Sequence, residues 1–203
     1  MLAEAEIEQK LREKLSAARW AHSRRVQATA GRLALKYGAD VGRARLAGLV
    51  HDCAKGMTAA ELMNAASLFG LKPDRVEIEQ PDLLHGPVGA GLCRREFGIT
   101  DEAVLSAVSK HTTGDGKMAV LEKIIYIADY TEPGRVFPGV GRLRAAAERD
   151  LDCAVLLAAD QTIRYVTVRG WLLHPRTLAA REAARQKVVR KGVNCHDDAN
   201  KIE

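Results

Sequence analysis

The amino-acid sequence predicts an all-α protein that folds as one domain. Apolar residues recur at intervals of three and four along almost the whole chain, and Gly or Pro interrupts the pattern between segments. Ala, Leu, Arg and Glu, which favour helices, are abundant. A length of 203 residues with 47% hydrophobic and 28% charged side chains suits a folded domain and excludes disordered and collagen-like chains.

Glycines and capping residues mark the helices expected in the first half of the chain. Gly38 and Gly56 each follow a helical pattern, and glycine is common just after a helix end. Thr58 with Glu61 three residues later forms a capping box. The helices expected from these signals cover about residues 4–15, 17–37, 41–55 and 58–69, and a connector that holds at most one helical turn covers residues 73–81.

The second half of the chain shows the same kind of punctuation. Gly98 and Gly170 follow apolar periodic segments, and Pro175 precedes the last one, where helix entries often carry proline. Helices are expected at about residues 87–97, 101–111, 119–130, 142–149, 151–169 and 177–191. We interpret residues 1–16 as an N-terminal helix packed on or extending a domain of residues 17–191, followed by a flexible tail of residues 192–203 that includes His196.

Several cellular contexts are excluded by the sequence. No apolar run approaches the ~18 residues that cross a bilayer, and the N-terminus lacks a basic and then apolar signal peptide. We therefore expect a soluble, cytoplasmic protein without a membrane partner. In that compartment the four cysteines, which form no C-x-x-C pair, are expected to be reduced and mostly buried thiols: Cys53, Cys93, Cys153 and Cys195.

The net charge of +5 raises the question of a nucleic-acid partner. Only 4% of the residues are aromatic and no block of consecutive Lys or Arg occurs, so a long nucleic acid is not expected. The basic helix at residues 176–191 is interpreted as a solvated helix packed on the bundle through Leu178, Val188 and Val189, with an RNA or ribosome contact as the alternative.

Histidines and aspartates in apolar helical segments carry the main functional signal. Asp129 follows the apolar residues 124–128, and His51 and Asp52 follow Leu49 and Val50. Burying such carboxylates is costly unless they are paired or bind a cation, and helical proteins build metal sites from His and carboxylate side chains of separate helices. The complete set exceeds the four ligands of a closed zinc site and suits two metals that share a bridging carboxylate: His22, His51, Asp52, His85, His111 and Asp129.

Each of these residues also has a simpler interpretation. His22 could be an ordinary core or surface histidine, and His85 could cap a helix. His111 could be a favourable cation at a helix C-terminus, and Asp129 could pair with an arginine. Without a metal, each of these residues needs its own separate explanation, and all of these explanations would have to be true together. We therefore favour the metal interpretation.

The order His22, His51-Asp52, Asp129 on successive helices resembles the HD-domain superfamily of metal-dependent phosphohydrolases. Longer strings are similar to the YqeK-type bacterial branch of that superfamily. They are HDCAK at residues 51–55, LHGPVGA at 84–90, KHTTG at 110–114, EKIIYIADYTEP at 122–133, FPGV at 137–140 and HP-x-T at 174–177. The resemblance covers about residues 17–185.

This resemblance implies an HD-domain helical bundle with a buried di-metal site. One metal would bind His22, His51, Asp52 and Asp129, and the second would bind His85 and His111 with Asp52 as the bridge. Iron, in a divalent or mixed-valence pair, is the metal that the branch suggests, whereas the donor types alone suit manganese, cobalt or zinc equally.

The resemblance also implies a reaction, the symmetrical cleavage of dinucleoside tetraphosphates by a metal-bridged hydroxide, so that diadenosine tetraphosphate gives two ADP. Two alternatives stay open. One is an HD-type nucleotidase or phosphodiesterase that acts on mononucleotides or cyclic nucleotides. The other is a non-catalytic nucleotide- or ribosome-binding module in which metals only stabilise the fold. A homodimer is also left open.

Positive side chains near the ligands are candidates for binding phosphate. Asp52 and Lys55, one turn apart, are the expected catalytic residues, and Lys55 also serves as a phosphate contact. The remaining expected substrate contacts are Arg25, Thr113, Gly114, Arg135 and His174. The alternatives are that Arg25 pairs with a carboxylate, that Lys55 and Arg135 face solvent, that Thr113 forms a turn and that His174 caps the last helix.

Overall fold

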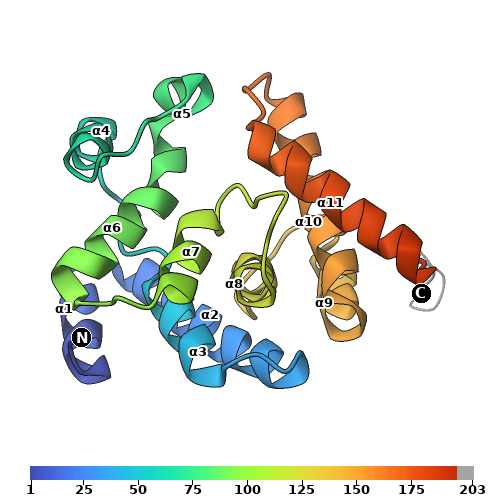
Figure 1. Ribbon diagram of the computed structural model, residues 1–203, viewed down its shortest axis with the longest axis horizontal. Helices are drawn as coiled ribbons and strands as arrows, with labels where there is room; N and C mark the ends of the chain where they lie inside the picture. The colour runs from blue at the N-terminus through green and yellow to red at the C-terminus, as the bar shows by residue number, and fades with distance from the viewer. Residues whose placement is uncertain (196–203) are drawn as a thin grey trace.

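The computed structural model describes residues 1–195, in which helices are joined by short turns and no strand occurs (Figure 1). The all-α prediction is confirmed. The helices are α1 (Glu4–Lys14), α2 (Ala17–Lys36), α3 (Val41–Val50), α4 (Ala59–Leu68), α5 (Arg75–Glu79), the 3-10 helix η1 (Pro81–Leu84), α6 (His85–Phe97), α7 (Glu102–Lys110), α8 (Val120–Thr131), α9 (Val140–Arg149), α10 (Leu151–Val168) and α11 (Pro175–Lys191).

Helix α8 runs through the middle of the molecule. Its segment Ile124–Ala128 is fully buried, and a helix that is apolar on every side has to be enclosed by other elements. Figure 1 shows α8 nearly end-on, with α2, α3 and α7 on one side and α9 and α10 on the other, and it packs against all of them. Asp129, which follows the apolar segment, is thereby placed among helices from distant parts of the chain.

One predicted helix ends earlier than the periodicity suggests. The expectation of a continuous helix over residues 41–55 is wrong, because α3 ends at Val50 and hydrogen-bonded turns follow it to Gly56. In these turns Cys53 N donates to Val50 O at 3.0 Å and Lys55 N donates to Asp52 O at 2.8 Å. These bonds span three residues, so the backbone is wound more tightly than an α-helix where His51 and Asp52 occur.

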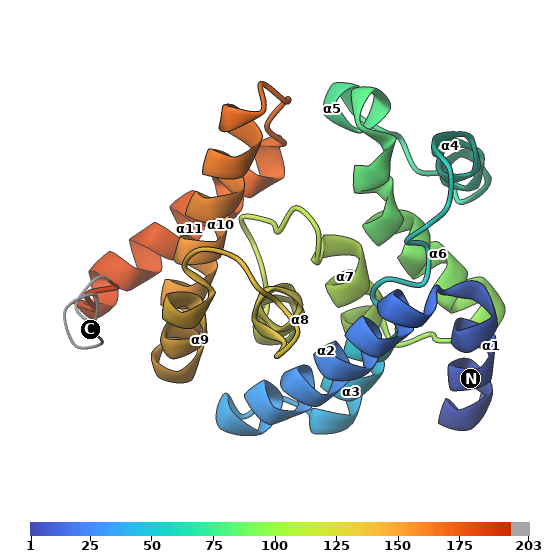
Figure 2. The same ribbon diagram turned by 180° about the vertical axis from the view of Figure 1, so that it is seen from behind.

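Two arms extend from the central region, as Figures 1 and 2 show. One arm contains α4, α5 and η1, and the other contains the paired helices α10 and α11. Helix α11 packs along α10 and buries Ala180, Ala184 and Val188, which are spaced four residues apart. The predicted apolar face is therefore corrected: Leu178 and Val189 are exposed, and small alanines line the side of α11 that approaches the neighbouring helix.

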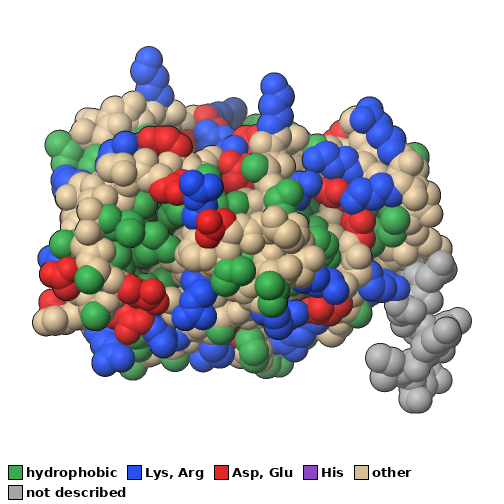
Figure 3. Space-filling model, turned by 60° about the horizontal axis from the view of Figure 1, so that its bottom comes forward, with side chains coloured by type: hydrophobic (Ala, Val, Ile, Leu, Met, Phe, Trp, Pro, Cys, Tyr) green, Lys and Arg blue, Asp and Glu red, His purple; other side chains and the backbone are tan. Residues whose placement is uncertain are grey.

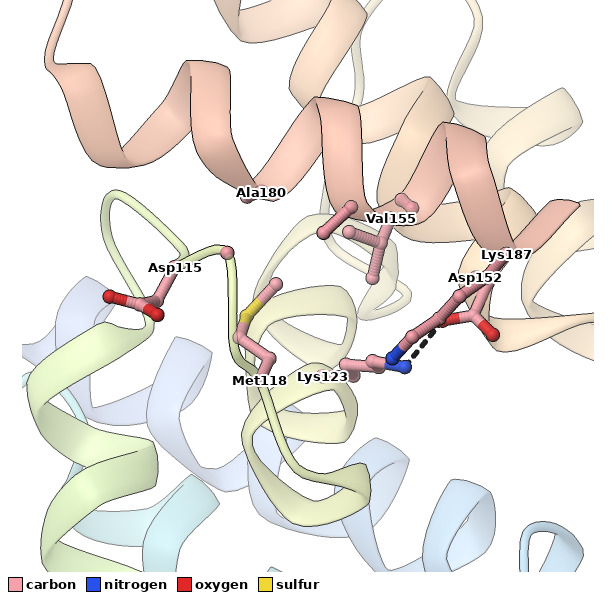
Figure 4. A pocket seen from close by; sticks show the side chains of 10 residues that line it. Asp115, Met118, Lys123, Asp152, Val155, Ala180 and Lys187 are labelled. Carbon is pink, nitrogen blue, oxygen red and sulfur yellow. Dashed lines mark hydrogen bonds and ion pairs between the residues drawn. The ribbon is translucent and has the colours of Figure 1, made fainter.

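A buried ion pair links the central helix to the second arm. Lys123 of α8 donates to Asp152 of α10, and Lys191 of α11 donates to the second oxygen of Asp152 at 2.8 Å. Figure 4 shows Lys123 and Asp152 side by side below α11, with Val155 and Met118 beside them. The arm is thus joined to the central helix by polar contacts as well as by apolar packing.

The cysteines differ from the prediction in one pair. Cys53 and Cys93 are buried thiols with their sulfurs 3.8 Å apart, whereas Cys153 and Cys195 form a disulfide, which corrects the expectation of reduced thiols. Gly192 ends α11 with φ of 63°, and the following residues turn back so that Cys195 is buried against α10. This fold-back joins residues 42 positions apart, which cysteine spacing alone does not reveal. The rest of the predicted tail, residues 196–203 with His196, lies outside the described residues.

The surface is mixed in charge. On the face drawn in Figure 3, basic, acidic and apolar side chains alternate, and no histidine is visible. This agrees with the burial of His22, His51, His85, His111 and His174, each 6% exposed or less. Within residues 1–195 no helix is both long and apolar enough to span a membrane.

Candidate metal centre

Five helices bring six histidine and aspartate side chains together. The second turn of α2 provides His22, and the turns after α3 provide His51 and Asp52. The other three side chains are His85 at the start of α6, His111 directly after α7 and Asp129 in the last turn of α8. These six residues are the ones that the sequence predicts as metal ligands.

Asp52 lies at the centre of this group. Its Oδ2 lies 3.3 Å from His51 Nε2 and 3.7 Å from His22 Nε2. Its Oδ1 lies 3.4 Å from His85 Nε2 and 3.5 Å from His111 Nε2. Each carboxylate oxygen thus faces one pair of histidines, an arrangement in which one carboxylate is able to bridge two metal ions.

The two histidine pairs differ in composition. Asp129 belongs to the first pair, because its Oδ1 lies 2.9 Å from His22 Nε2 and 3.9 Å from His51 Nε2. The second pair, His85 and His111, has its Nε2 atoms 3.1 Å apart, and within residues 1–195 Asp52 is the carboxylate that lies within 4 Å of them. The first group therefore offers four donor atoms and the second offers three, which leaves more room for a water or substrate oxygen in the second.

The other nitrogen of each ring is held by the fold. Nδ1 of His51 lies 2.8 Å from Gly48 O and Nδ1 of His111 lies 2.7 Å from Val108 O. His85 makes the same contact, three residues back, with the carbonyl of Asp82. A carbonyl only accepts hydrogen bonds, so Nδ1 carries a proton and Nε2 is the nitrogen that faces Asp52. A histidine that binds a metal through Nε2 is commonly oriented by such a hydrogen bond from Nδ1.

Charges in the group shift its pKa values in opposite directions. Burial alone would raise the pKa of Asp52, but His51 and His111 hold it well below its ordinary value. Burial opposes the charging of His51, yet Asp52 and Asp129 raise its pKa to about 9. The pKa of His85 is lowered to about 4 by burial, by His111 and by Lys55. The side with two carboxylates therefore attracts positive charge, and the imidazole of His85 is neutral at pH 7.

Three residues that the sequence analysis does not assign belong to this region. Arg19 Nη1 donates to Asp52 Oδ2 at 2.7 Å, and Glu132 Oε1 accepts from His22 Nδ1 at 3.1 Å. Thr112 Oγ1 lies 3.1 Å from His85 Nε2. Arg19 precedes His22 by nearly one helical turn, which is a signal in the sequence, whereas the role of Glu132 depends on how α8 ends beside α2.

The predicted phosphate contacts Lys55 and Arg135 lie close to the ligand group. Lys55 Nζ donates to Asp82 Oδ2 at 2.6 Å, and its charge acts on His85. Arg135 donates from Nε to Asp129 O at 2.7 Å and from Nη2 to the carboxylate of the same residue. Arg25 instead donates to Glu132 through Nε at 2.5 Å, as in the alternative considered for it, and reaches His22 only through that carboxylate.

The other three predicted substrate contacts lie elsewhere. Thr113 is buried and its hydroxyl donates to Gly114 O at 3.1 Å, while its carbonyl accepts from Thr177 of α11. Gly114 has φ of 67°, and a Cβ there would lie 2.9 Å from Ala180. This turn therefore packs beneath α11, and the neighbouring Thr112 faces the histidines instead. His174 contacts Asp74 and Glu77 of α5, not the group around Asp52.

The donor set fits divalent metal ions. Neutral imidazole nitrogens and carboxylate oxygens suit Fe, Mn, Co and Zn, and the triplets His22–His51–Asp129 and His51–Asp52–His111 each bring their donor atoms within 4.8 Å of one another. Asp52 and Asp129 already accept from Arg19 and Arg135, and a cation among the four converging imidazoles would compensate these carboxylates further. The geometry is therefore compatible with metal binding.

Comparisons with known proteins agree with this geometry. Residues 19–134 match the family model of the HD domain. The chain is 37% identical over 167 residues to a Bacillus subtilis protein named "Bis(5'-nucleosyl)-tetraphosphatase, symmetrical", covering 82% of this chain and 89% of the relative. A Halalkalibacterium halodurans protein of the same name is 42% identical over 161 residues, covering 79% of this chain and 86% of the relative.

A solved structure shows the same fold. The crystal structure of a predicted HD superfamily hydrolase involved in NAD metabolism from Clostridium acetobutylicum superposes with a TM-score of 0.90 at 43% sequence identity. The match covers 92% of this chain and 99% of that one. Since the family model spans more than half of the chain and the relatives cover most of it, the chain belongs to the HD-domain family of metal-dependent hydrolases.

Proposed function

We propose that this chain hydrolyses dinucleoside tetraphosphates symmetrically, converting diadenosine tetraphosphate and water into two ADP. The observation that carries the proposal is the placement of Asp52 between two pairs of histidines, which suits a two-metal phosphohydrolase. The names of the Bacillus subtilis and Halalkalibacterium halodurans relatives support the choice of substrate and the symmetry of cleavage.

In this proposal His22, His51, Asp52 and Asp129 would hold the first metal, and His85 and His111, together with Asp52, would hold the second. Iron is the metal that we propose, on the strength of the resemblance to the YqeK-type branch. Metals bound in these positions lower the pKa of a water ligand and polarise the phosphoryl oxygens of the substrate.

The remaining residues of the site bind the phosphate chain or orient the histidines. We propose that Lys55 releases the exposed carboxylate of Asp82 and binds a phosphoryl oxygen, because the pair lies beside His85 and 70% of the Asp82 side chain is exposed. Arg135, with 35% of its side chain exposed, would offer its remaining N–H groups to the phosphate chain while it holds Asp129. Glu132, which pairs with Arg25, accepts from His22 Nδ1 and so orients Nε2 toward Asp129 and Asp52.

Product analysis tests the proposal. The metal-loaded protein incubated with diadenosine tetraphosphate is expected to give ADP as the sole product, and Asp52→Asn is expected to reduce turnover by on the order of 100-fold or more. Asp160→Asn is the matched control, since that carboxylate pairs with Arg181 on the surface and is expected to leave turnover unchanged.

Three outcomes would contradict the proposal. Products of ATP and AMP would exclude symmetrical cleavage. Absence of turnover with iron, manganese, cobalt and zinc would remove the assignment, and faster turnover of mononucleotides or cyclic nucleotides would favour the alternative substrate class. The cytoplasmic location and the possible homodimer expected from the sequence stay predictions.

A further inference from the structure

A second group of potential metal ligands lies between the two arms. His174, just before α11, faces two carboxylates of the α5 region: its Nε2 lies 3.2 Å from Asp74 Oδ2 and 3.6 Å from Glu77 Oε1. These three donor atoms lie within 4.8 Å of one another. None of the three residues belongs to the group around Asp52.

In each of these side chains, another polar atom accepts a hydrogen bond from a backbone N–H group. Asp74 Oδ1 accepts from Glu77 N at 3.0 Å, and Glu77 Oε2 accepts from Asp74 N at 3.0 Å, which together form the capping box of α5. His174 Nδ1 accepts from Arg176 N at 3.1 Å and caps α11. Each residue therefore has a second polar atom that takes no part in capping, and these atoms of all three residues converge on one place.

His174 is the residue that most needs a partner. The residue is 4% exposed, and its Nε2 is buried without a hydrogen-bond partner in the structure, although two carboxylate oxygens lie nearby. Glu77 is also buried, at 3% exposed, and its free oxygen has only the Nη1 of Arg176 at 3.5 Å. A buried imidazole nitrogen and a buried carboxylate with so few contacts are costly, and a cation between them would compensate both.

We propose that Asp74, Glu77 and His174 form a separate divalent-metal site for a zinc-class ion, distinct from the metal pair at Asp52. One imidazole and two carboxylates suit zinc, cobalt, manganese or iron, and three protein ligands leave at least one position for water. The 42% exposed side chain of Asp74 gives an ion access from solvent.

The protonation of His174 sets the strength of this site. Because Nδ1 accepts from Arg176 N, the proton of the neutral ring lies on Nε2, in contrast to the four histidines around Asp52. A metal bound to Nε2 requires that proton to move to Nδ1, and the hydrogen bond from Arg176 is then lost. The site is therefore expected to bind metal more weakly than the centre at Asp52, and to exchange it more readily.

A metal at this place would connect the two arms of the molecule. Asp74 and Glu77 belong to the arm that continues through η1 into His85, and His174 begins the helix of the opposite arm. Side-chain hydrogen bonds, such as that from Gln80 Nε2 to Leu172 O at 2.8 Å, also join these two segments. Zinc binding should therefore raise the thermal stability of the protein even when the main centre is disabled.

Zinc counting by equilibrium dialysis against micromolar free zinc tests the proposal without measuring activity. Wild-type protein is expected to hold three zinc ions per chain and His174→Asn two. Asn is itself a favourable helix cap, so this variant keeps the cap of α11 while it removes the imidazole. Glu79→Gln, an exposed carboxylate on the same short helix, is the matched control and should hold three ions.

A second measurement separates this site from the main centre. Zinc is expected to raise the melting temperature of Asp52→Asn, and to leave that of the double variant Asp52→Asn/His174→Asn unchanged. Equal zinc content in wild type and His174→Asn would overturn the proposal, as would equal zinc-induced shifts in the single and double variants. Either result is independent of whether the chain hydrolyses dinucleoside tetraphosphates.

Discussion

At the scale of single residues, protonation is controlled by the contacts of the second ring nitrogen. His51, His85 and His111 each direct Nδ1 to the carbonyl three residues earlier, whereas His22 uses the carboxylate of Glu132. The carbonyl contacts follow from local helix geometry and need no further residue. His22 lies inside α2, where every carbonyl is already engaged in the helix, so its partner has to come from another part of the chain.

Glu132→Gln is therefore expected to weaken metal binding by about 10- to 100-fold. A neutral amide accepts more weakly from His22 Nδ1, which makes Nε2 a poorer metal ligand, and it leaves Arg25 without its carboxylate. Competition with a chelator measures the affinity. Glu148→Gln, whose side chain is 47% exposed and pairs with Arg32, serves as the control. Unchanged affinity in Glu132→Gln would show that the orientation of His22 does not depend on this carboxylate.

At the scale of helices, a single glycine permits the approach that brings His85 and His111 together. A Cβ at Gly86 would lie 2.7 Å from Ser109 O and 3.2 Å from Thr112 Oγ1. Ser109 O is backbone and cannot move aside, so a larger residue would push α6 away from the end of α7. The glycine in the string HGPVGA thus has a packing reason as well as a place in the family motif.

Gly86→Ala is accordingly expected to lower the free energy of unfolding by about 1–3 kcal/mol and to reduce the metal content by about one ion per chain, since His85 and His111 separate. Thermal unfolding and elemental analysis report the two effects. Gly141→Ala is the control: nothing lies within 4 Å of a Cβ there, and stability should stay equal or rise slightly. Full metal content in Gly86→Ala would contradict this account.

At the scale of the whole molecule, the central helix and the second arm are joined around Asp152. The carboxylate accepts from Lys123 of α8 and Lys191 of α11, and only 8% of its side chain is exposed. Burial would raise the pKa of Asp152, but the hydrogen bonds and charges of these two lysines lower it below its ordinary value. The ion pair therefore contributes to stability only while Asp152 is ionised.

The sign of the resulting pH dependence follows from this lowered pKa. The contribution of Asp152 is fully present above the pKa of an unfolded aspartate, about 3.9, and is lost as the pH falls through the lower pKa of the folded state. Asp152→Asn is expected to lose about 1–3 kcal/mol at pH 7 and to show a shallower decline in acid than wild type. Denaturant unfolding between pH 7 and pH 3 measures both, and parallel declines in the two proteins would contradict the prediction.

The sequence by itself determined the helical class, most helix bounds and the six residues that gather at the metal centre. Helix signals are local, since they depend on periodicity, caps and glycines within a few residues, and buried histidines and aspartates stand out among apolar neighbours. The resemblance of strings such as HDCAK and IADYTEP to HD-domain proteins added the expected chemistry. The family matches confirm that resemblance.

Only the tertiary structure decided which distant groups meet. Glu132 reaches His22, Cys195 reaches Cys153 and His174 reaches Asp74 across 110, 42 and 100 positions in sequence. The turn at Thr113 and Gly114 looks like a phosphate contact in the sequence, but it packs beneath α11, and Thr112 faces the histidines instead. Such contacts depend on how whole helices pack, and side-chain volumes far along the chain set that packing. A local pattern therefore identifies candidate ligands but does not determine their neighbours.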